Sequence, residues 1–130
     1  MLVRMILACS AILFLTEAKA AENCRKLSFE AREALIRKAP TCDKAMKQFQ
    51  NCNSGGTADI NLGGIATERC EADFLKKLNA EQRQAYAGEI KACNDEVKED
   101  EGTLSRAIGA SCRATAAQDY AHKFGKRPSR

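Results

Sequence analysis

Apolar residues recur at every third or fourth position along most of the chain from residue 24 onward, which is the spacing of amphipathic helices. The first run predicts a helix that ends near Ala39, because Pro40 disfavours helical angles in the residue before it. Thr41 can then cap a second helix by accepting a hydrogen bond from an early backbone N–H. The apolar positions are Cys24, Leu27, Ala31, Ala34 and Leu35, then Cys42, Ala45, Met46, Phe49 and Cys52. We expect Met46 and Phe49 to fill the core rather than a ligand pocket.

The second half predicts three more helices. Helical spacing resumes near Ala66, and Asn79 with Gln82 then forms the pattern of a capping box, so a fourth helix begins there. After an acidic turn that we expect to be solvated, Thr103 is expected to cap a fifth helix. The apolar positions are Ala66, Cys70, Phe74 and Leu78, then Tyr86, Ile90, Cys93 and Val97, then a stripe of Leu104, Ile108, Cys112, Ala116, Tyr120 and Phe124. The neighbouring alanines would allow close helix approach, and they are Ala107, Ala110, Ala114, Ala117 and Ala121.

The segment from Asn53 to Gly64, NSGGTADINLGG, interrupts the helical spacing with two Gly-Gly pairs. It predicts a loop of about twelve residues, the longest irregular piece of the domain. It does not have the pattern of a phosphate cradle, because no Gly-Lys-Ser/Thr follows and no strand precedes it. Such a loop is either a binding element or slack, and the sequence leaves both open. The candidate binding residues are Asn53, Ser54, Gly55, Gly56, Asp59, Asn61, Gly63 and Gly64.

Residues 1–20 have the order of an export signal. Arg4 is followed by an apolar run of 12 residues from Met5 to Thr16, and Ala18-Lys19-Ala20 is a small-x-small cleavage pattern. We expect cleavage after Ala20. A run of 12 is too short for a permanent membrane helix, so no stable membrane insertion is expected afterwards. The alternative, an N-terminal core helix, does not account for these three features in this order. The predicted location is the periplasm or the cell exterior.

Six of the 7 cysteines remain after this cleavage. In an exported chain an even number predicts a disulfide framework. A zinc site would need close cysteine pairs or histidines, whereas the intervals here hold between 9 and 22 residues and the chain has 1 histidine. We therefore expect three structural disulfides, with no metal and no cofactor.

Six cysteines allow 15 pairings, so the sequence alone leaves the connectivity open. Helix geometry ranks the pairings. Cys93 and Cys112 stand level across the turn at Gly102-Thr103, and Cys24 and Cys52 are roughly level across the Pro40 turn. This leaves Cys42 with Cys70.

Composition and charge narrow the function. A chain of 130 residues with 45% apolar content fits one domain, and only 5% aromatic residues suggest a thin core. The mature chain has 19 basic and 16 acidic residues, a net charge of +3, which is far from a nucleic-acid footprint. No nucleophile-elbow or zinc-protease motif occurs, and we expect the lone His122 to be exposed. The prediction is an all-α bundle of about five helices over residues 21–124, a disordered basic tail over 125–130, and no enzymatic activity.

The order of Cys70, Leu78-Asn79, Tyr86, Cys93, Gly102-Thr103 and Cys112 resembles the cysteine-rich helical module of the LprI-type lysozyme-inhibitor family. The resemblance covers about Cys70 to Tyr120. The chain lacks tryptophan and the Arg-Asp that usually precedes the Cys93-like position. The resemblance implies an exported helical module whose partner is a lysozyme or another cell-wall-directed protein.

The sequence thus favours an exported, non-catalytic binding protein that offers the Asn53–Gly64 segment to an enzyme's cleft. The alternative is a structural or stress-related envelope protein without a dedicated ligand. An enzyme is the least supported class.

Overall fold

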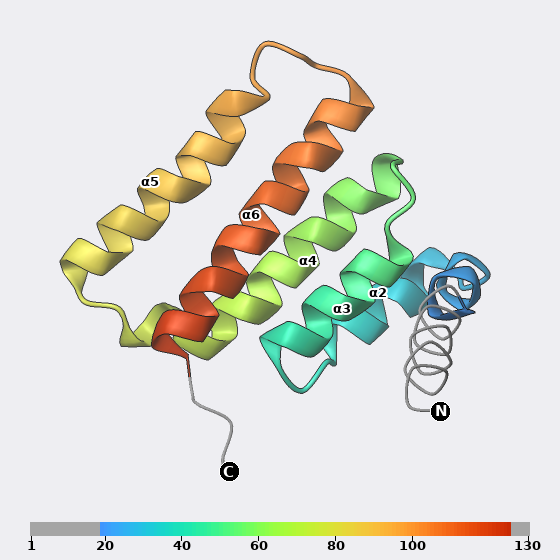
Figure 1. Cartoon of the computed structure of the whole chain (residues 1–130), viewed down its shortest axis with the longest axis horizontal. Coiled ribbons are helices and arrows are strands. Elements are labelled where there is room, and N and C mark those ends of the chain that lie inside the picture. Colours follow the sequence, from blue (N-terminus) through green and yellow to red (C-terminus); the bar gives the residue numbers. More distant parts are fainter. Residues whose placement is uncertain (1–18, 126–130) are drawn as a thin grey trace, which may run out of the picture.

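The computed structural model describes residues 19–125, and every regular element in this range is a helix (Figure 1). The all-α, disulfide-bonded prediction is confirmed. The predicted signal peptide, apart from its last two residues, and the basic tail beyond Gly125 lie outside the described residues. A helical stretch at residues 19–25 is followed by α2 (Phe29–Arg37), α3 (Cys42–Cys52), α4 (Thr57–Phe74), the short 3₁₀ helix η1 (Leu75–Lys77), α5 (Ala80–Glu96) and α6 (Thr103–Phe124).

The helices α4 and α6 form the centre of the domain. Figure 1 shows α6 between α5 and α4, with α2 and α3 on the far side of α4. The backbones of α4 and α6 approach closely because small residues meet at their contact. A Cβ atom added at Gly63 of α4 would lie 2.9 Å from the Cβ of Ala110 in α6.

The buried face of α6 differs from the predicted stripe. Leu104 and Ile108 are 63% and 53% exposed, while the alanine row is buried: Ala107, Ala110, Ala114, Ala117 and Ala121. The row recurs at spacings of three and four residues, whereas the stripe recurs at every fourth residue, and only the small side chains of the row permit the close contact with α4. The residues expected merely to flank the packed face therefore form most of it, together with Tyr120 of the predicted stripe.

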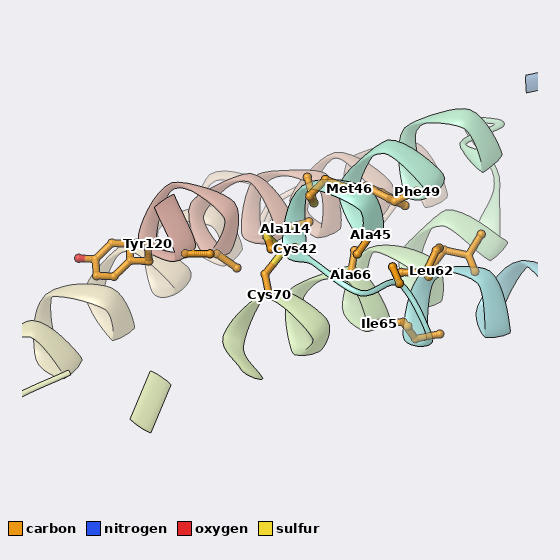
Figure 2. Close-up of a cluster of buried hydrophobic side chains, with 14 of the residues drawn as sticks. Cys42, Ala45, Met46, Phe49, Leu62, Ile65, Ala66, Cys70, Ala114 and Tyr120 are labelled. Atoms are coloured by element: carbon orange, nitrogen blue, oxygen red, sulfur yellow. A yellow bond between two sulfur atoms is a disulfide. The ribbon is translucent and has the colours of Figure 1, made fainter. Parts of the chain in front are cut away.

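The predicted faces of α3 and α4 supply much of the core. The buried cluster in Figure 2 takes Met46 and Phe49 from α3, Leu62 from α4 and Ala114 from α6. Both Met46 and Phe49 are 2% exposed, which confirms their assignment to the core. Within residues 19–125, no helix is both long and apolar enough to cross a membrane.

Three disulfides staple the helices in the pairing that geometry ranked first. Cys24 pairs with Cys52, Cys42 with Cys70, and Cys93 with Cys112. The second pair joins α3 to α4, and the third joins α5 to α6.

Several helix starts follow local capping chemistry. Thr41 accepts a hydrogen bond from Lys44 N–H at 3.2 Å, and Asn79 and Gln82 form the predicted reciprocal box. The cap of α6 is Gly102 rather than Thr103, which is the first residue of the helix.

The first predicted helix is broken. Residues 26–28 form a turn between the N-terminal helical stretch and α2, where Ser28 accepts a hydrogen bond from Ala31 N–H at 3.2 Å. The Arg32 guanidinium stabilises this turn by donating to the carbonyls of Arg25 and Leu27. Ser28 competes for the backbone as a helix cap, so one continuous helix from Cys24 to Ala39 does not form.

Candidate functional site

The predicted binding loop is mostly helix. Only Asn53, Ser54, Gly55 and Gly56 form the connection, and α4 begins at Thr57. The other candidate residues, Asp59, Asn61, Gly63 and Gly64, lie inside α4. The expected twelve-residue loop is therefore wrong in extent.

Asp59 explains why the helix starts so early. Its carboxylate is fully buried and accepts backbone N–H bonds from Ser54 at 3.0 Å, Gly55 at 2.5 Å and Gly56 at 3.0 Å. Gly55 supplies the positive φ of 79° that the turn requires. These bonds satisfy the backbone donors of the connecting turn and of Gly56, which caps α4, and the carboxylate is occupied by them. The segment thus has a structural role, and a search for an acidic residue three positions after Gly56 could have found it.

A concave surface lies between α2 and α3. It is a groove of about 810 Å³, and its lining is mainly apolar. The apolar lining residues are Leu27, Ala31, Ala34, Leu35, Ala39 and Pro40, and the polar ones are Lys38, Lys44, Lys47 and Gln48. A volume of this size lies in the range of small-molecule sites.

The groove exists because α2 packs on the core with a face different from the predicted one. Ile36 is fully buried, whereas Leu27 and Leu35 are 37% and 41% exposed. The spacing that predicted a buried stripe is real, but no described residue covers it completely. The stripe therefore lines an open groove instead of the core.

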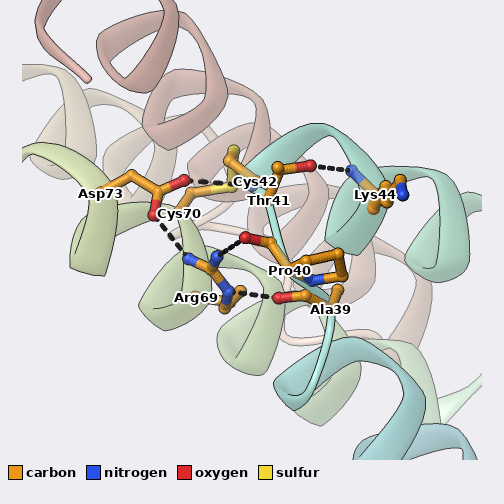
Figure 3. A network of polar contacts seen from close by, with 8 residues as sticks. All are labelled: Ala39, Pro40, Thr41, Cys42, Lys44, Arg69, Cys70 and Asp73. Atoms are coloured by element: carbon orange, nitrogen blue, oxygen red, sulfur yellow. Dashed lines mark hydrogen bonds and ion pairs between the residues drawn. A yellow bond between two sulfur atoms is a disulfide. The ribbon is translucent and has the colours of Figure 1, made fainter. Parts of the chain in front are cut away.

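Polar contacts of Arg69 hold the turn at Ala39 and Pro40, two of the groove's lining residues (Figure 3). The Arg69 guanidinium donates to the carbonyls of Ala39 and Pro40, both at 2.7 Å, and to Asp73 Oδ1 at 2.8 Å. Asp73 Oδ2 in turn accepts from Cys42 N–H at 3.1 Å. These bonds tie the turn between α2 and α3 to α4, beside the Cys42–Cys70 disulfide. Ala39 and Pro40 of the same turn also line the groove.

A second polar group lies on the surface between α3 and α6. Asp43 Oδ1 accepts from Gln118 Nε2 at 2.8 Å and contacts His122 Nε2 at 2.5 Å. The hydrogen bond from Gln118 and then that with His122 lower the pKa of Asp43 below its usual value. His122 is exposed, as expected, but it has a partner. The contact with Asp43 orients the His122 imidazole at the surface. All cysteines of the described residues are in disulfides, so none offers a free thiol as a nucleophile.

The described residues contain no candidate metal-binding site. Across residues 19–125, no three His, Cys, Asp or Glu side chains are grouped so that they could hold an ion.

The residues that carry the family resemblance have structural roles. Cys70, Cys93 and Cys112 are in disulfides, and Asn79 caps α5. Tyr86 is buried edge-on against Phe74, with ring centroids 5.1 Å apart. Comparison of the chain with family models, with curated proteins and with solved structures finds no match.

Proposed function

We propose that this chain is an exported, non-catalytic binding protein that takes an apolar ligand in the α2–α3 groove. The observation that carries the proposal is the groove itself, a half-open apolar surface whose lining residues Ala39 and Pro40 are held by Arg69. Small-molecule sites are concave and mostly apolar, with a few polar groups at defined places. Leaving Leu27 and Leu35 partly exposed costs hydrophobic stabilisation that a bound ligand would restore.

Export is supported by two independent features. The N-terminal sequence has the order of a signal peptide, and the six cysteines that follow it form three disulfides. Disulfides persist in oxidising spaces such as the bacterial periplasm. The periplasm or the cell exterior therefore remains our proposed location.

The test uses Nile red, a neutral apolar dye, with the oxidised mature protein, residues 21–130. We expect saturable fluorescence enhancement that is weakened at least about fivefold by Leu35→Gln, because the substitution places an amide in the apolar lining. Leu104→Gln is the matched control, since Leu104 is more exposed than Leu35 and lies on α6, outside the groove. Equal weakening by both variants, or no saturable binding by the parent protein, would remove the proposal.

A narrower version, in which the partner is a lysozyme or another cell-wall-directed enzyme, is supported by the residue order from Cys70 to Cys112. This residue order supports the helical module more directly than it supports lysozyme inhibition, because its residues are helix caps, core residues and disulfide cysteines. A lysozyme lysis assay with the mature protein tests it. Unchanged lysis at micromolar excess would leave the groove proposal standing and remove the inhibitor. If neither ligand class binds, an envelope protein without a dedicated ligand becomes the better description.

A further inference from the structure

The charged residues that line the α2–α3 groove are all cationic. Lys38 follows the end of α2, and Lys44 and Lys47 lie three residues apart on α3, so that both reach the same side of that helix. The opposite side, formed by α2 and the segment before it, is apolar: Leu27, Ala31, Ala34 and Leu35. One wall thus offers ammonium groups and the other offers hydrocarbon.

These three lysines are available to an anion. Ion pairs within residues 19–125 join other cations to carboxylates, such as Arg37 to Glu33 and Lys91 to Asp95, and none of them involves Lys38, Lys44 or Lys47. All three lysines are exposed, so their heads can remain in water while their stems extend along the groove. A carboxylate at the rim would therefore meet unpaired positive charge without needing to break an existing ion pair.

We propose that the groove holds a single-chain amphiphile with an anionic head, namely a long-chain carboxylate. The inference rests on the proposed function and names its ligand class. The hydrocarbon chain lies along the α2 wall between Leu27 and Ala39, and the carboxylate is held by Lys44 and Lys47, with Lys38 at the turn. A volume of about 810 Å³ accommodates such a molecule.

The dimensions favour a small molecule over a protein partner. The helix α2 has nine residues, which corresponds to about 14 Å. Ten residues line the groove, whereas a standard protein interface uses roughly 20 to 30 residues on each side. A flat bilayer is also a poorer fit, because the apolar surface is hollowed between two helices rather than raised above them.

The experiment measures displacement of Nile red from the mature protein by three amphiphiles with the same twelve-carbon chain: dodecanoate, dodecan-1-ol and dodecyltrimethylammonium. Each is used below the concentration at which it forms micelles or separates from solution. We expect dodecanoate to bind about tenfold more tightly than the alcohol, and the cation to bind more weakly than the alcohol. Raising the salt concentration should weaken dodecanoate binding alone.

The matched variants have equal charge. Lys44→Gln with Lys47→Gln is expected to weaken dodecanoate binding about tenfold and to leave dodecan-1-ol unchanged. Lys76→Gln with Lys77→Gln removes the same charge from η1, outside the groove, and should leave both ligands unchanged. Equal losses in the two double variants would show a general charge effect and overturn the inference.

The outcomes separate this inference from the proposed function. Equal displacement by all three amphiphiles would overturn the anionic head and leave the apolar groove in place. Failure of Nile red itself to bind would remove the groove function first. Sedimentation with phosphatidylglycerol vesicles that depends on Lys44 and Lys47, without binding of monomeric dodecanoate, would assign the lysines to a membrane surface and overturn the inference.

Discussion

One added methyl group at Gly63 is expected to destabilise the domain, while the same change at the next residue stabilises it. Both glycines lie inside α4. A Cβ at Gly63 would lie 2.9 Å from the Cβ of Ala110 and 3.2 Å from its backbone carbon and oxygen. A Cβ at Gly64 would meet nothing within 4 Å.

The magnitudes follow from two opposing effects. Replacing a helical glycine by alanine stabilises by roughly 0.5 to 1 kcal/mol, because the unfolded chain loses freedom. Overpacking a well-filled contact costs about 1 to 3 kcal/mol. We therefore expect Gly64→Ala to gain about 0.5 to 1 kcal/mol, with only the first effect present. Gly63→Ala should lose about 1 to 2 kcal/mol, because the backbone of α6 cannot rotate away as a flexible side chain could.

The assay is equilibrium urea denaturation of the oxidised protein, followed by helical circular dichroism, for the parent and both variants. A double variant, Gly63→Ala with Ala110→Gly, removes the closest atom of the clash. We expect a favourable coupling of at least about 0.5 kcal/mol relative to the two single changes. Equal stabilisation by Gly63→Ala and Gly64→Ala would refute the close α4–α6 contact and with it the described centre of the fold.

Three further outcomes are expected. Arg69→Lys should lower the free energy of unfolding by about 1 to 3 kcal/mol in the same assay, because an ammonium group cannot replace the planar guanidinium that bonds both carbonyls of the turn. The control, Arg37→Lys on the exposed face of α2, should change it by less than about 0.5 kcal/mol. Gln118→Ala should raise the pKa of Asp43, which NMR titration measures, because the amide no longer donates to the carboxylate. Since folding lowers this pKa, the stabilisation that Asp43 contributes is present above its unfolded pKa and is lost as the pH falls through its folded pKa. Reduction of all three disulfides should destabilise by several kcal/mol, at about 3 kcal/mol for each loop of 19 to 28 residues, and an unchanged melting temperature in reductant would contradict the stapled core.

The parts of the fold that sequence reasoning predicted are those decided by neighbouring residues. Thr41 and the Asn79–Gln82 box were predictable because a cap and its backbone donor lie within one turn. The ranking of the disulfide pairings agreed with the structure because each bridge joins helical segments that are close together in the chain. Ser28 and Asp59 carried the same kind of local signal, and the glycine content around Asp59 concealed it.

The parts that sequence reasoning missed depend on distant residues. The stripe of α6 recurs every four residues and the alanine row at spacings of three and four; both spacings fit a helix face, and hydrophobicity favours the stripe with Leu104 and Ile108. The alanine row is buried instead, and within it Ala110 faces Gly63, nearly fifty residues earlier in the chain. The groove was missed for the same reason. Whether the Leu27–Leu35 face is covered depends on where α2 packs against α3 and α4, and periodicity does not specify that.

The disulfide connectivity has a consequence for maturation. Cys42 lies within the loop closed by Cys24 and Cys52, and Cys52 lies within the loop closed by Cys42 and Cys70, so the first two bridges interleave. A polypeptide that emerges into an oxidant with its N-terminus leading presents Cys24 and Cys42 together, before either native partner arrives. A bond between them would have to be resolved by thiol–disulfide exchange, the reaction that disulfide isomerases catalyse. No cysteine lies between Cys93 and Cys112, so the third bridge does not interleave with the other two.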